Sequence, residues 1–325
     1  MTDRRTFLAR LAATAALGGA ALSSTALGSK ALGSTALGSA NVAAGGATGR
    51  GATKLLSRVI PSSGEALPVI GMGTSRTFDV AAEPAALRPL AEVVRALFDG
   101  GATLIDSSPM YGRAEAVTGR LLSDLGNPGV FAATKVWADG REAGIRQMEE
   151  SFRLLGVPRM DLMQVHNLRD WRTHLATLRE WKESGRIRYV GITTSRKDQY
   201  GEFAAVMRAE PLDFVQLNYS LGEREAEQVL LPLARDRGMA VLVNRPYMRG
   251  ELFSRVRGKA LPAWASELDC TTWGQLFMKF ILAHPAVTCV IPATTSVRNM
   301  QDNLAGGSGQ LPDEALRQRM IAAIG

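Results

Sequence analysis

Residues 130–166 read VFAATKVWADGREAGIRQMEESFRLLGVPRMDLMQVH. Two short and mostly apolar runs, Val130–Lys135 and Asp161–His166, enclose an amphipathic segment, Arg141–Leu155, which is followed by Gly156. Short apolar runs of this kind are typical of parallel strands that are buried on both faces. The segment between them has a helical pattern, and a glycine commonly ends a helix. The stretch therefore predicts a strand–helix–strand unit.

The same alternation continues on both sides of this unit. Apolar runs predict strands over Pro68–Met72, Thr103–Asp106, Val130–Lys135, Asp161–His166, Ile187–Ile192, Leu212–Leu217, Ala240–Asn244 and Val287–Ile291. Amphipathic segments predict helices over Leu87–Asp99, Arg141–Leu155, Leu175–Ser184, Glu223–Arg237 and Thr271–Ala283. Eight such units imply an α/β fold, a closed TIM (β/α)₈ barrel over residues 55–325. An open, doubly wound sheet is the alternative.

Two further segments stand out from the alternation. Arg58–Ile70 has the turn residues Ser63 and Gly64 between two apolar runs, which predicts an N-terminal β-hairpin that plugs the bottom of the barrel. Arg245–Cys270 is longer than an ordinary strand–helix connection. We expect it to be either a lid over the active site or a structural excursion.

The first forty residues have the pattern of a targeting signal. Arg4 and Arg5 stand just before Phe7 and an Ala/Leu-rich run, which is typical of a twin-arginine export signal over residues 1–40. The apolar run is too short and too weak to predict a spanning helix. Residues 41–54 are low in complexity and are predicted to be a linker. We expect export through the Tat machinery to the periplasm; a cytoplasmic protein whose tail carries two arginines by coincidence is the alternative.

The distribution of charge and the spacing of the cysteines argue against two classes of function, nucleic-acid binding and metal binding. The net charge of +7 is not concentrated in a basic run, so no nucleic-acid-binding face is predicted. The two cysteines, Cys270 and Cys289, do not form a C-x-x-C pair, and no metal site is predicted. The oligomeric state is open at this level.

Four ionisable side chains fall at or just after the predicted ends of consecutive strands: Asp106, Tyr111, Lys135 and His166. Active sites of (β/α)₈ barrels lie at the carboxyl ends of the strands, so these four are expected to meet. A neighbouring ammonium group is expected to lower the pKa of the phenol, and Asp106 would hold the lysine charged. His166 would orient a carbonyl oxygen that Tyr111 protonates as hydride arrives.

At these residues the sequence resembles the aldo-keto reductase family, over roughly residues 55–312. The resemblance is carried by Gly71-Met72-Gly73-Thr74, Ile105-Asp106-Ser107-Ser108, Tyr111-Gly112, Ala133-Thr134-Lys135, Gln164-Val165-His166-Asn167, Val190-Gly191-Ile192, Val215-Gln216-Leu217-Asn218-Tyr219 and Val290-Ile291-Pro292.

The resemblance implies a metal-free, nicotinamide-dependent reduction of aldehydes or ketones, with the family's catalytic tetrad at the four residues named above. By analogy with the family, Asn167 and Gln216 would bind the carboxamide of the cofactor, and Thr74 and Asp106 would lie near the ribose. Trp137 falls where the family places a substrate-pocket aromatic, so it joins Tyr111 and His166 as a substrate residue. The family also implies NADPH as cofactor, with NADH as the alternative.

The sequence departs from the family pattern after three strands. The family often has Ser-Asn-Phe where this chain has a run that begins at Thr193, and Tyr-Ser-Pro where this chain has Asn244 and Arg245 before a proline. After the last strand, the basic candidate for a 2′-phosphate is Arg298. The full set of cofactor-binding candidates is Thr74, Asp106, Asn167, Thr193, Gln216, Asn244, Arg245, Thr294, Arg298 and Asn303.

Three rival interpretations remain at this level. The sequence of Gly71–Arg76 nearly matches the dinucleotide-fold fingerprint, but an arginine replaces its third glycine. A lysine at a barrel strand end is also the nucleophile of Schiff-base aldolases, which would give that role to Lys135. The third interpretation is a non-catalytic barrel that binds a nicotinamide cofactor as a sensor or partner subunit.

Overall fold

The parallel sheet of this protein closes on itself. The computed structural model describes residues 54–324, in which eight strands pair in chain order, each parallel to the next. The first and last strands are joined where the Gly71 N–H donates to the Val290 carbonyl (2.9 Å) and the Val290 N–H donates to the Val69 carbonyl (2.9 Å). The predicted barrel is therefore confirmed, and the open sheet is wrong. The strands are β3 (Met72–Gly73), β4 (Leu104–Asp106), β5 (Phe131–Val136), β6 (Met160–His166), β7 (Ile187–Thr193), β8 (Phe214–Asn218), β9 (Ala240–Asn244) and β10 (Val287–Val290).

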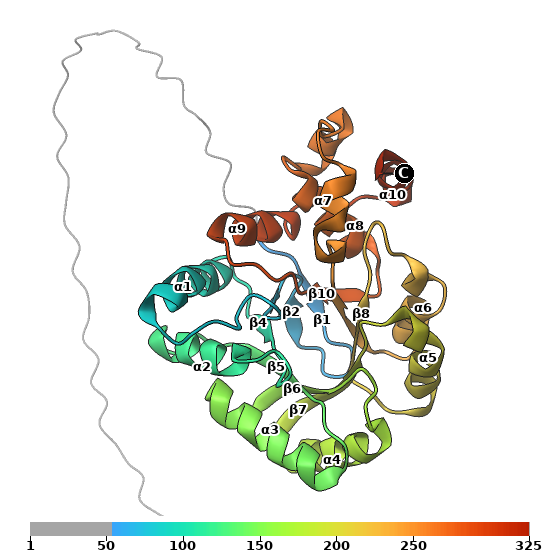
Figure 1. Ribbon diagram of the computed structural model, residues 1–325. Helices are drawn as coiled ribbons and strands as arrows, with labels where there is room; N and C mark the ends of the chain where they lie inside the picture. Colours follow the sequence, from blue (N-terminus) through green and yellow to red (C-terminus); the bar gives the residue numbers. More distant parts are fainter. Residues whose placement is uncertain (1–53, 325) are drawn as a thin grey trace, which may run out of the picture. The chain divides into compact units, whose positions relative to one another are not determined.

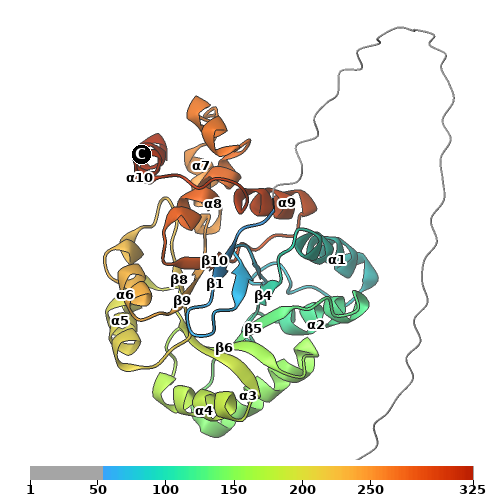
Figure 2. The same cartoon turned by 180° about the vertical axis from the view of Figure 1, so that it is seen from behind.

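Helices form a ring outside the strands (Figures 1 and 2). The helices of this ring bury an apolar face, as Leu90, Val94 and Leu97 of the first helix do. The short helix Glu251–Arg255 and the last helix, Glu314–Ile324, stand outside the ring, beyond Trp273–Ala283 (Figure 1). The helices are α1 (Pro84–Asp99), α2 (Ala114–Asp124), α3 (Arg141–Leu155), α4 (Trp171–Glu183), α5 (Tyr200–Ala209), α6 (Leu230–Asp236), α7 (Glu251–Arg255), α8 (Trp273–Ala283), α9 (Val297–Gly306) and α10 (Glu314–Ile324).

A β-hairpin plugs the amino-terminal end of the barrel, as the sequence predicts. Its strands are β1 (Ser57–Val59) and β2 (Ala66–Pro68), and it overlies the middle of the strand ring in Figure 1. Ile60 and Leu67 are buried in the inner core, together with residues near the amino-terminal ends of the strands, such as Phe131 and Tyr189. The Tyr189 hydroxyl donates to Ser63 in the hairpin turn (2.7 Å). This end is therefore filled, and the opposite end is left for a site.

Two predicted elements are divided in the structure. The strand predicted over Pro68–Met72 is divided, because Pro68 ends the hairpin and the barrel strand begins at Met72. The helix predicted over Glu223–Arg237 is a 3₁₀ turn, Glu225–Glu227, followed by α6. Glu223 is outside both, because its backbone pairs with that of Ser220 in a turn, where its carboxylate also accepts a hydrogen bond from Asn218 (2.9 Å).

The long segment after β9 is partly folded. It contains 3₁₀ turns at Met248–Gly250 and Ala263–Leu268 and the short helix α7. Leu252 and Leu268 are buried in the core, so part of the segment is structural. Its first residues line the cavity described below.

The sequence also makes predictions about an export signal, membrane-spanning helices, the two cysteines and metal sites. The export signal and most of the linker lie outside the described residues. No helix in residues 54–324 is long and apolar enough to cross a membrane. In the same range Cys270 and Cys289 are buried free thiols, and no group of histidine, cysteine or acidic side chains is arranged to hold a metal.

Candidate active site

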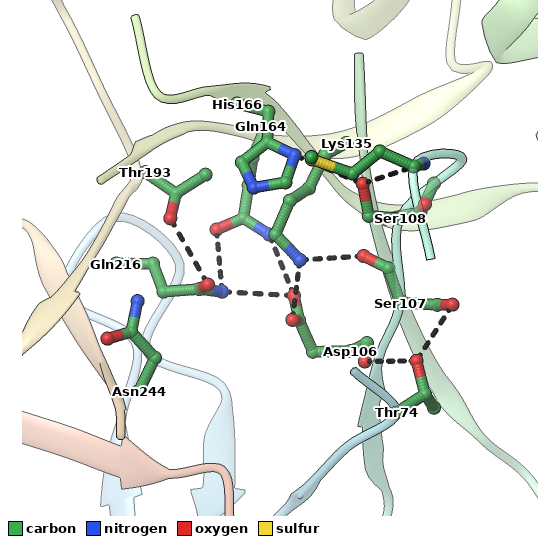
Figure 3. A network of polar contacts seen from close by, with 12 residues as sticks. Thr74, Asp106, Ser107, Ser108, Lys135, Gln164, His166, Thr193, Gln216 and Asn244 are labelled. Carbon is green, nitrogen blue, oxygen red and sulfur yellow. Dashed lines mark hydrogen bonds and ion pairs between the residues drawn. The ribbon is translucent and has the colours of Figure 1, made fainter. Parts of the chain in front are cut away.

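A cavity of about 980 Å³ opens at the carboxyl ends of the strands, opposite the hairpin. Every second residue of a strand faces the barrel interior. The inward residues are apolar near the amino-terminal ends, such as Leu104, Leu162 and Phe214. Two or four residues further along the same strands they are polar, which brings side chains from six strands to one rim. These include Asp106, Lys135, Gln164, His166, Thr193, Gln216 and Asn244 (Figure 3).

A buried ion pair lies among these side chains, beneath the cavity. The Lys135 ammonium contacts the Asp106 carboxylate at 2.6 Å, and the two side chains are 0% and 3% exposed. The ammonium also donates to the Ser107 carbonyl (2.6 Å). The other Asp106 oxygen accepts hydrogen bonds from the amides of Gln164 and Gln216, both at 3.0 Å (Figure 3). The two charges neutralise each other, and the remaining oxygen of Asp106 and a second hydrogen of Lys135 have hydrogen-bond partners. The ion pair is therefore held in one geometry.

Tyr111 lies close to both the ammonium group of this ion pair and the imidazole of His166. The Lys135 Nζ is 5.1 Å from the centre of the phenol ring. The rings of Tyr111 and His166 meet edge to face, with centres 5.8 Å apart. Tyr111 and His166 line the cavity, whereas Lys135 is buried beneath its wall. The four residues of the predicted tetrad are therefore brought together.

The expected direction of the phenol pKa is corrected. Burial raises the pKa of Tyr111 above its ordinary value, and the opposing effect of the Lys135 charge is smaller. Burial also disfavours the lysine charge, but Asp106 and Tyr111 outweigh it and the pKa of Lys135 is raised. Tyr111 is therefore protonated and Lys135 charged at neutral pH. A charged ammonium 5.1 Å from the centre of the phenol ring would stabilise a phenolate at this position.

His166 is a neutral hydrogen-bond donor at neutral pH. Burial, followed by the Lys135 charge, lowers the pKa of His166 to about 3. Its Nδ1 lies 3.1 Å from the Ser108 hydroxyl, which accepts the Met110 backbone N–H (3.4 Å). In the tautomer that carries the ring proton on Nε2, the serine hydroxyl donates to Nδ1 and the Nε2–H is left for a ligand. Sequence analysis missed this role of Ser108, although the residue lies in the quoted motif after β4.

We expect Ser108→Ala to lower kcat/KM for carbonyl reduction by about two- to tenfold, the effect of losing one hydrogen bond that fixes the donor tautomer. Steady-state assays at saturating cofactor measure this. Ser107→Ala is the matched control, because that hydroxyl contacts Thr74 (2.9 Å) and not the imidazole. If both variants retain the parent kcat/KM, Ser108 does not fix the tautomer of His166.

The cavity rim fits a carboxamide, the recognition group of a nicotinamide. The Asn167 Oδ1 accepts the Ser195 N–H (3.1 Å), and its NH₂ has no partner among residues 54–324. Conversely, the Asn244 NH₂ donates to the Thr194 carbonyl (3.2 Å), whereas its buried Oδ1 has no partner in the described part of the chain. One free donor and one free acceptor match the oxygen and NH₂ of a carboxamide. Asn167 and Asn244 would therefore hold it.

Gln216 and Thr193 have a different setting from the two asparagines. The Gln216 NH₂ donates to Asp106 and Gln164, and its Oε1 accepts the Thr193 hydroxyl (3.1 Å). Both residues line the cavity, but their polar atoms are engaged in the network beneath it. Gln216 therefore supports the ion pair directly, and Thr193 supports it through Gln216.

The remaining predicted residues divide into two groups. Thr74, Arg245, Thr294 and Asn303 line the cavity. Arg298 and Trp137 do not line it: the arginine is exposed on α9, and the indole lies under the Arg169 guanidinium, 4.3 Å from the ring centre. Apolar contact in the cavity comes instead from Met110 and Phe253, which sequence analysis did not assign to the site.

Comparisons with known proteins agree with this geometry. Residues 69–319 match the model of the Aldo/keto reductase family. Aldo-keto reductase YhdN of Bacillus subtilis (strain 168) is 31% identical over 185 residues, which are 51% of this chain and 54% of that protein, so the match spans about half of that relative's length. Methylglyoxal reductase YeaE of Escherichia coli (strain K12) is 27% identical over 256 residues, 76% of this chain and 88% of that protein.

The crystal structure of an aldo-keto reductase from Klebsiella pneumoniae in complex with NADPH superposes with a TM-score of 0.67 at 23% identity, over 84% of this chain and 95% of that one. With the tetrad assembled at the rim of the barrel, the family match over most of the sequence shows that this chain belongs to the aldo/keto reductase family.

Proposed function

We propose that this protein reduces aldehydes or ketones to alcohols, with NADPH as cofactor and Tyr111 as general acid. The observation that carries the proposal is the phenol of Tyr111, which is held over the Lys135–Asp106 ion pair and beside His166 at one cavity. When bound, NADPH supplies a hydride to the carbonyl carbon. The complex of the Klebsiella relative with NADPH supports the choice of cofactor.

The residues of this chain then have separate tasks. The His166 Nε2–H donates a hydrogen bond to the carbonyl oxygen and orients it. Tyr111 gives its proton to that oxygen as negative charge develops there. Lys135 stabilises the resulting phenolate, and Asp106 keeps Lys135 charged and in place. Asn167 and Asn244 would hold the carboxamide, which leaves the cavity beside Tyr111 for a small carbonyl substrate.

A panel of aldehydes and ketones tests the proposal, with NADPH and NADH compared side by side by the loss of nicotinamide absorbance. Turnover with NADPH, and a lower kcat/KM with NADH, are the expected results. Cofactor binding by fluorescence without turnover of any carbonyl would favour the sensor or partner-subunit interpretation and would contradict a reductase.

The Schiff-base aldolase interpretation is disfavoured by the setting of Lys135. A nucleophilic amine must lose its proton and reach the substrate. Here the ammonium is fully buried, is paired with Asp106 at 2.6 Å and has a raised pKa. Borohydride treatment in the presence of a carbonyl substrate should therefore leave no adduct on Lys135.

We also propose that the protein is exported by the twin-arginine route. Support comes from the order of Arg4-Arg5, Phe7-Leu8 and the Ala/Leu run in the sequence. A periplasmic location follows from the same proposal.

Replacement of both Arg4 and Arg5 by lysine is expected to leave the protein in the cytoplasm of a Gram-negative host, because the export receptor reads the guanidinium pair and lysine does not reproduce its planar donors. Cell fractionation with immunoblotting measures the exported share. Arg10→Lys, outside the pair, is the control. An undiminished periplasmic pool in the double variant would show that this segment is not a twin-arginine signal.

A further inference from the structure

Tyr111 is the one member of the tetrad that no strand carries. The other three lie within β4, β5 and β6, whereas Tyr111 lies in the loop between β4 and α2. Strand pairing therefore does not set the position of the phenol. That position decides whether the hydroxyl can give a proton to the substrate, so the contacts that hold the loop against the barrel matter for the reaction.

The loop leads directly into the first turn of α2. The Tyr111 carbonyl accepts the N–H of Ala114 (3.3 Å), the first residue of that helix. The next residue is Glu115, whose side chain is buried. Because Tyr111 and the start of α2 are joined by this hydrogen-bonded turn, a contact that holds Glu115 also limits the movement of Tyr111.

Glu115 is bound to the strand that carries Lys135. The Thr134 hydroxyl donates to the Glu115 carboxylate (2.5 Å), and both side chains are buried. Thr134 precedes Lys135 in β5, and successive residues of a strand point to opposite faces. Lys135 faces the barrel interior, and Thr134 contacts α2 on the other face of the same strand. The hydrogen bond thus joins the two segments that carry the proton donor and its cation.

The two ends of the loop are held by different contacts. At its start, the Ser107 carbonyl accepts the Lys135 ammonium (2.6 Å). At its end, Arg113 contacts Asp79 at 3.3 Å, but both of these side chains are more than half exposed. Water and salt weaken an exposed ion pair, whereas a buried hydrogen bond to a carboxylate is among the stronger ones in proteins. The bond from Thr134 is therefore the firmer contact at the end that carries Tyr111.

The buried position of Glu115 costs free energy that a neutral side chain would not. Burial raises the pKa of Glu115 above its ordinary value, and the hydrogen bond from Thr134 is the largest of the opposing effects. A buried acidic group is tolerated where such a bond compensates for the lost water. Glu115 and Thr134 therefore depend on each other.

We propose that Glu115 and Thr134 are positioning residues for carbonyl reduction, and that their buried hydrogen bond fixes the Tyr111 hydroxyl relative to Lys135 and the substrate. The inference rests on the proposed reductase function and deepens it. Neither Glu115 nor Thr134 lines the cavity, so their effect on the reaction passes through Tyr111.

Thr134→Val removes the hydroxyl and keeps the shape of the side chain. We expect kcat for carbonyl reduction at saturating NADPH to fall by about tenfold, because a small misplacement of a reacting group is costly. Thr134→Ser keeps the hydroxyl and should stay within about twofold of the parent kcat. Should Thr134→Val give too little folded protein, Glu115→Gln weakens the same hydrogen bond and takes its place.

Thr288→Val is the matched control for lost stability. Thr288 is also a buried threonine in a barrel strand, and its hydroxyl accepts the Val241 N–H (3.0 Å). It does not line the cavity. This variant should lower the thermal midpoint as Thr134→Val does, while its kcat stays within about twofold of the parent.

A double-mutant cycle with Tyr111→Phe separates positioning from a general structural role. If the pair acts through the Tyr111 hydroxyl, Thr134→Val should change kcat by less than about twofold once that hydroxyl is absent.

Three results would overturn the inference while leaving the reductase function intact. They are a parent kcat in Thr134→Val, an equal loss of kcat from Thr134→Val in both backgrounds, and the same loss in Thr288→Val. Parent activity in Tyr111→Phe would instead overturn the proton donor of the proposed function, and this inference with it.

Discussion

Tyr111→Phe is expected to lower kcat/KM for carbonyl reduction by about 10²–10⁴-fold, the range typical of losing a positioned general acid. This corresponds to roughly 3–5 kcal/mol of transition-state stabilisation. The variant removes the hydroxyl that would donate the proton, in a residue that lines the cavity beside the buried ammonium. Steady-state kinetics with a carbonyl substrate at saturating NADPH measure the effect.

The same variant should leave the fold and cofactor binding close to those of the parent. Phenylalanine keeps the ring that packs edge to face on His166 (5.8 Å) and lies over Lys135 (5.1 Å). NADPH binding by fluorescence and the thermal midpoint are the controls. A Tyr111→Phe protein that reduces carbonyls at the parent rate would exclude Tyr111 as the proton donor.

The direction of the Tyr111 pKa also sets an expectation for pH. Because burial raises this pKa above its ordinary value, the phenol keeps its proton through neutral pH and into mildly alkaline solution. Since the pKa of His166 is about 3, the imidazole stays neutral over the same range. Neither group should therefore produce a fall in kcat/KM near neutrality.

Lys135→Met is expected to affect both activity and stability. The phenolate would lose its nearest cation, so kcat/KM should fall by about 10²–10³-fold, by analogy with removing one donor that stabilises developing charge. The Asp106 carboxylate would remain buried without its partner, which typically costs about 3–5 kcal/mol. Kinetics and urea unfolding measure the two effects separately.

The double variant Lys135→Met with Asp106→Asn separates electrostatics from packing. It removes both charges, and the asparagine Oδ1 can still accept the hydrogen bonds from Gln164 and Gln216. We expect most of the lost stability to return, while activity stays low because the phenolate still has no cation beside it. Restored activity in the double variant, or parent activity in Lys135→Met, would contradict the role given to the lysine.

Much of the fold was predictable because its signal is local. Buried parallel strands such as Asp161–His166 are short and apolar, and helices such as Arg141–Leu155 have their own periodicity. The limits of Glu223–Arg237 were not predictable, because Glu223 belongs to a turn that is closed by backbone hydrogen bonds with Ser220 and by a side-chain bond from Asn218.

The tetrad was predictable for a geometric reason. Parallel strands end at one rim of a barrel, so residues at successive strand ends, Asp106, Lys135 and His166, must meet there whatever the loops do. Trp137 shows the limit of that reasoning. It follows Lys135 by two residues, but it lies beyond the end of β5, where strand alternation no longer fixes the direction of a side chain.

The sequence alone thus determined the barrel, its plugged end and the strand-end residues that meet at its open rim, because the period and the direction of the strands follow from the order of the residues. Only the tertiary structure decided the pairing of Ser108 with His166, the upward direction of the Tyr111 pKa and the hydrogen bond between Thr134 and Glu115. Those properties depend on burial and on charges that are distant in sequence. Desolvation and Coulomb energy are sums over neighbours in space, which the order of residues does not specify.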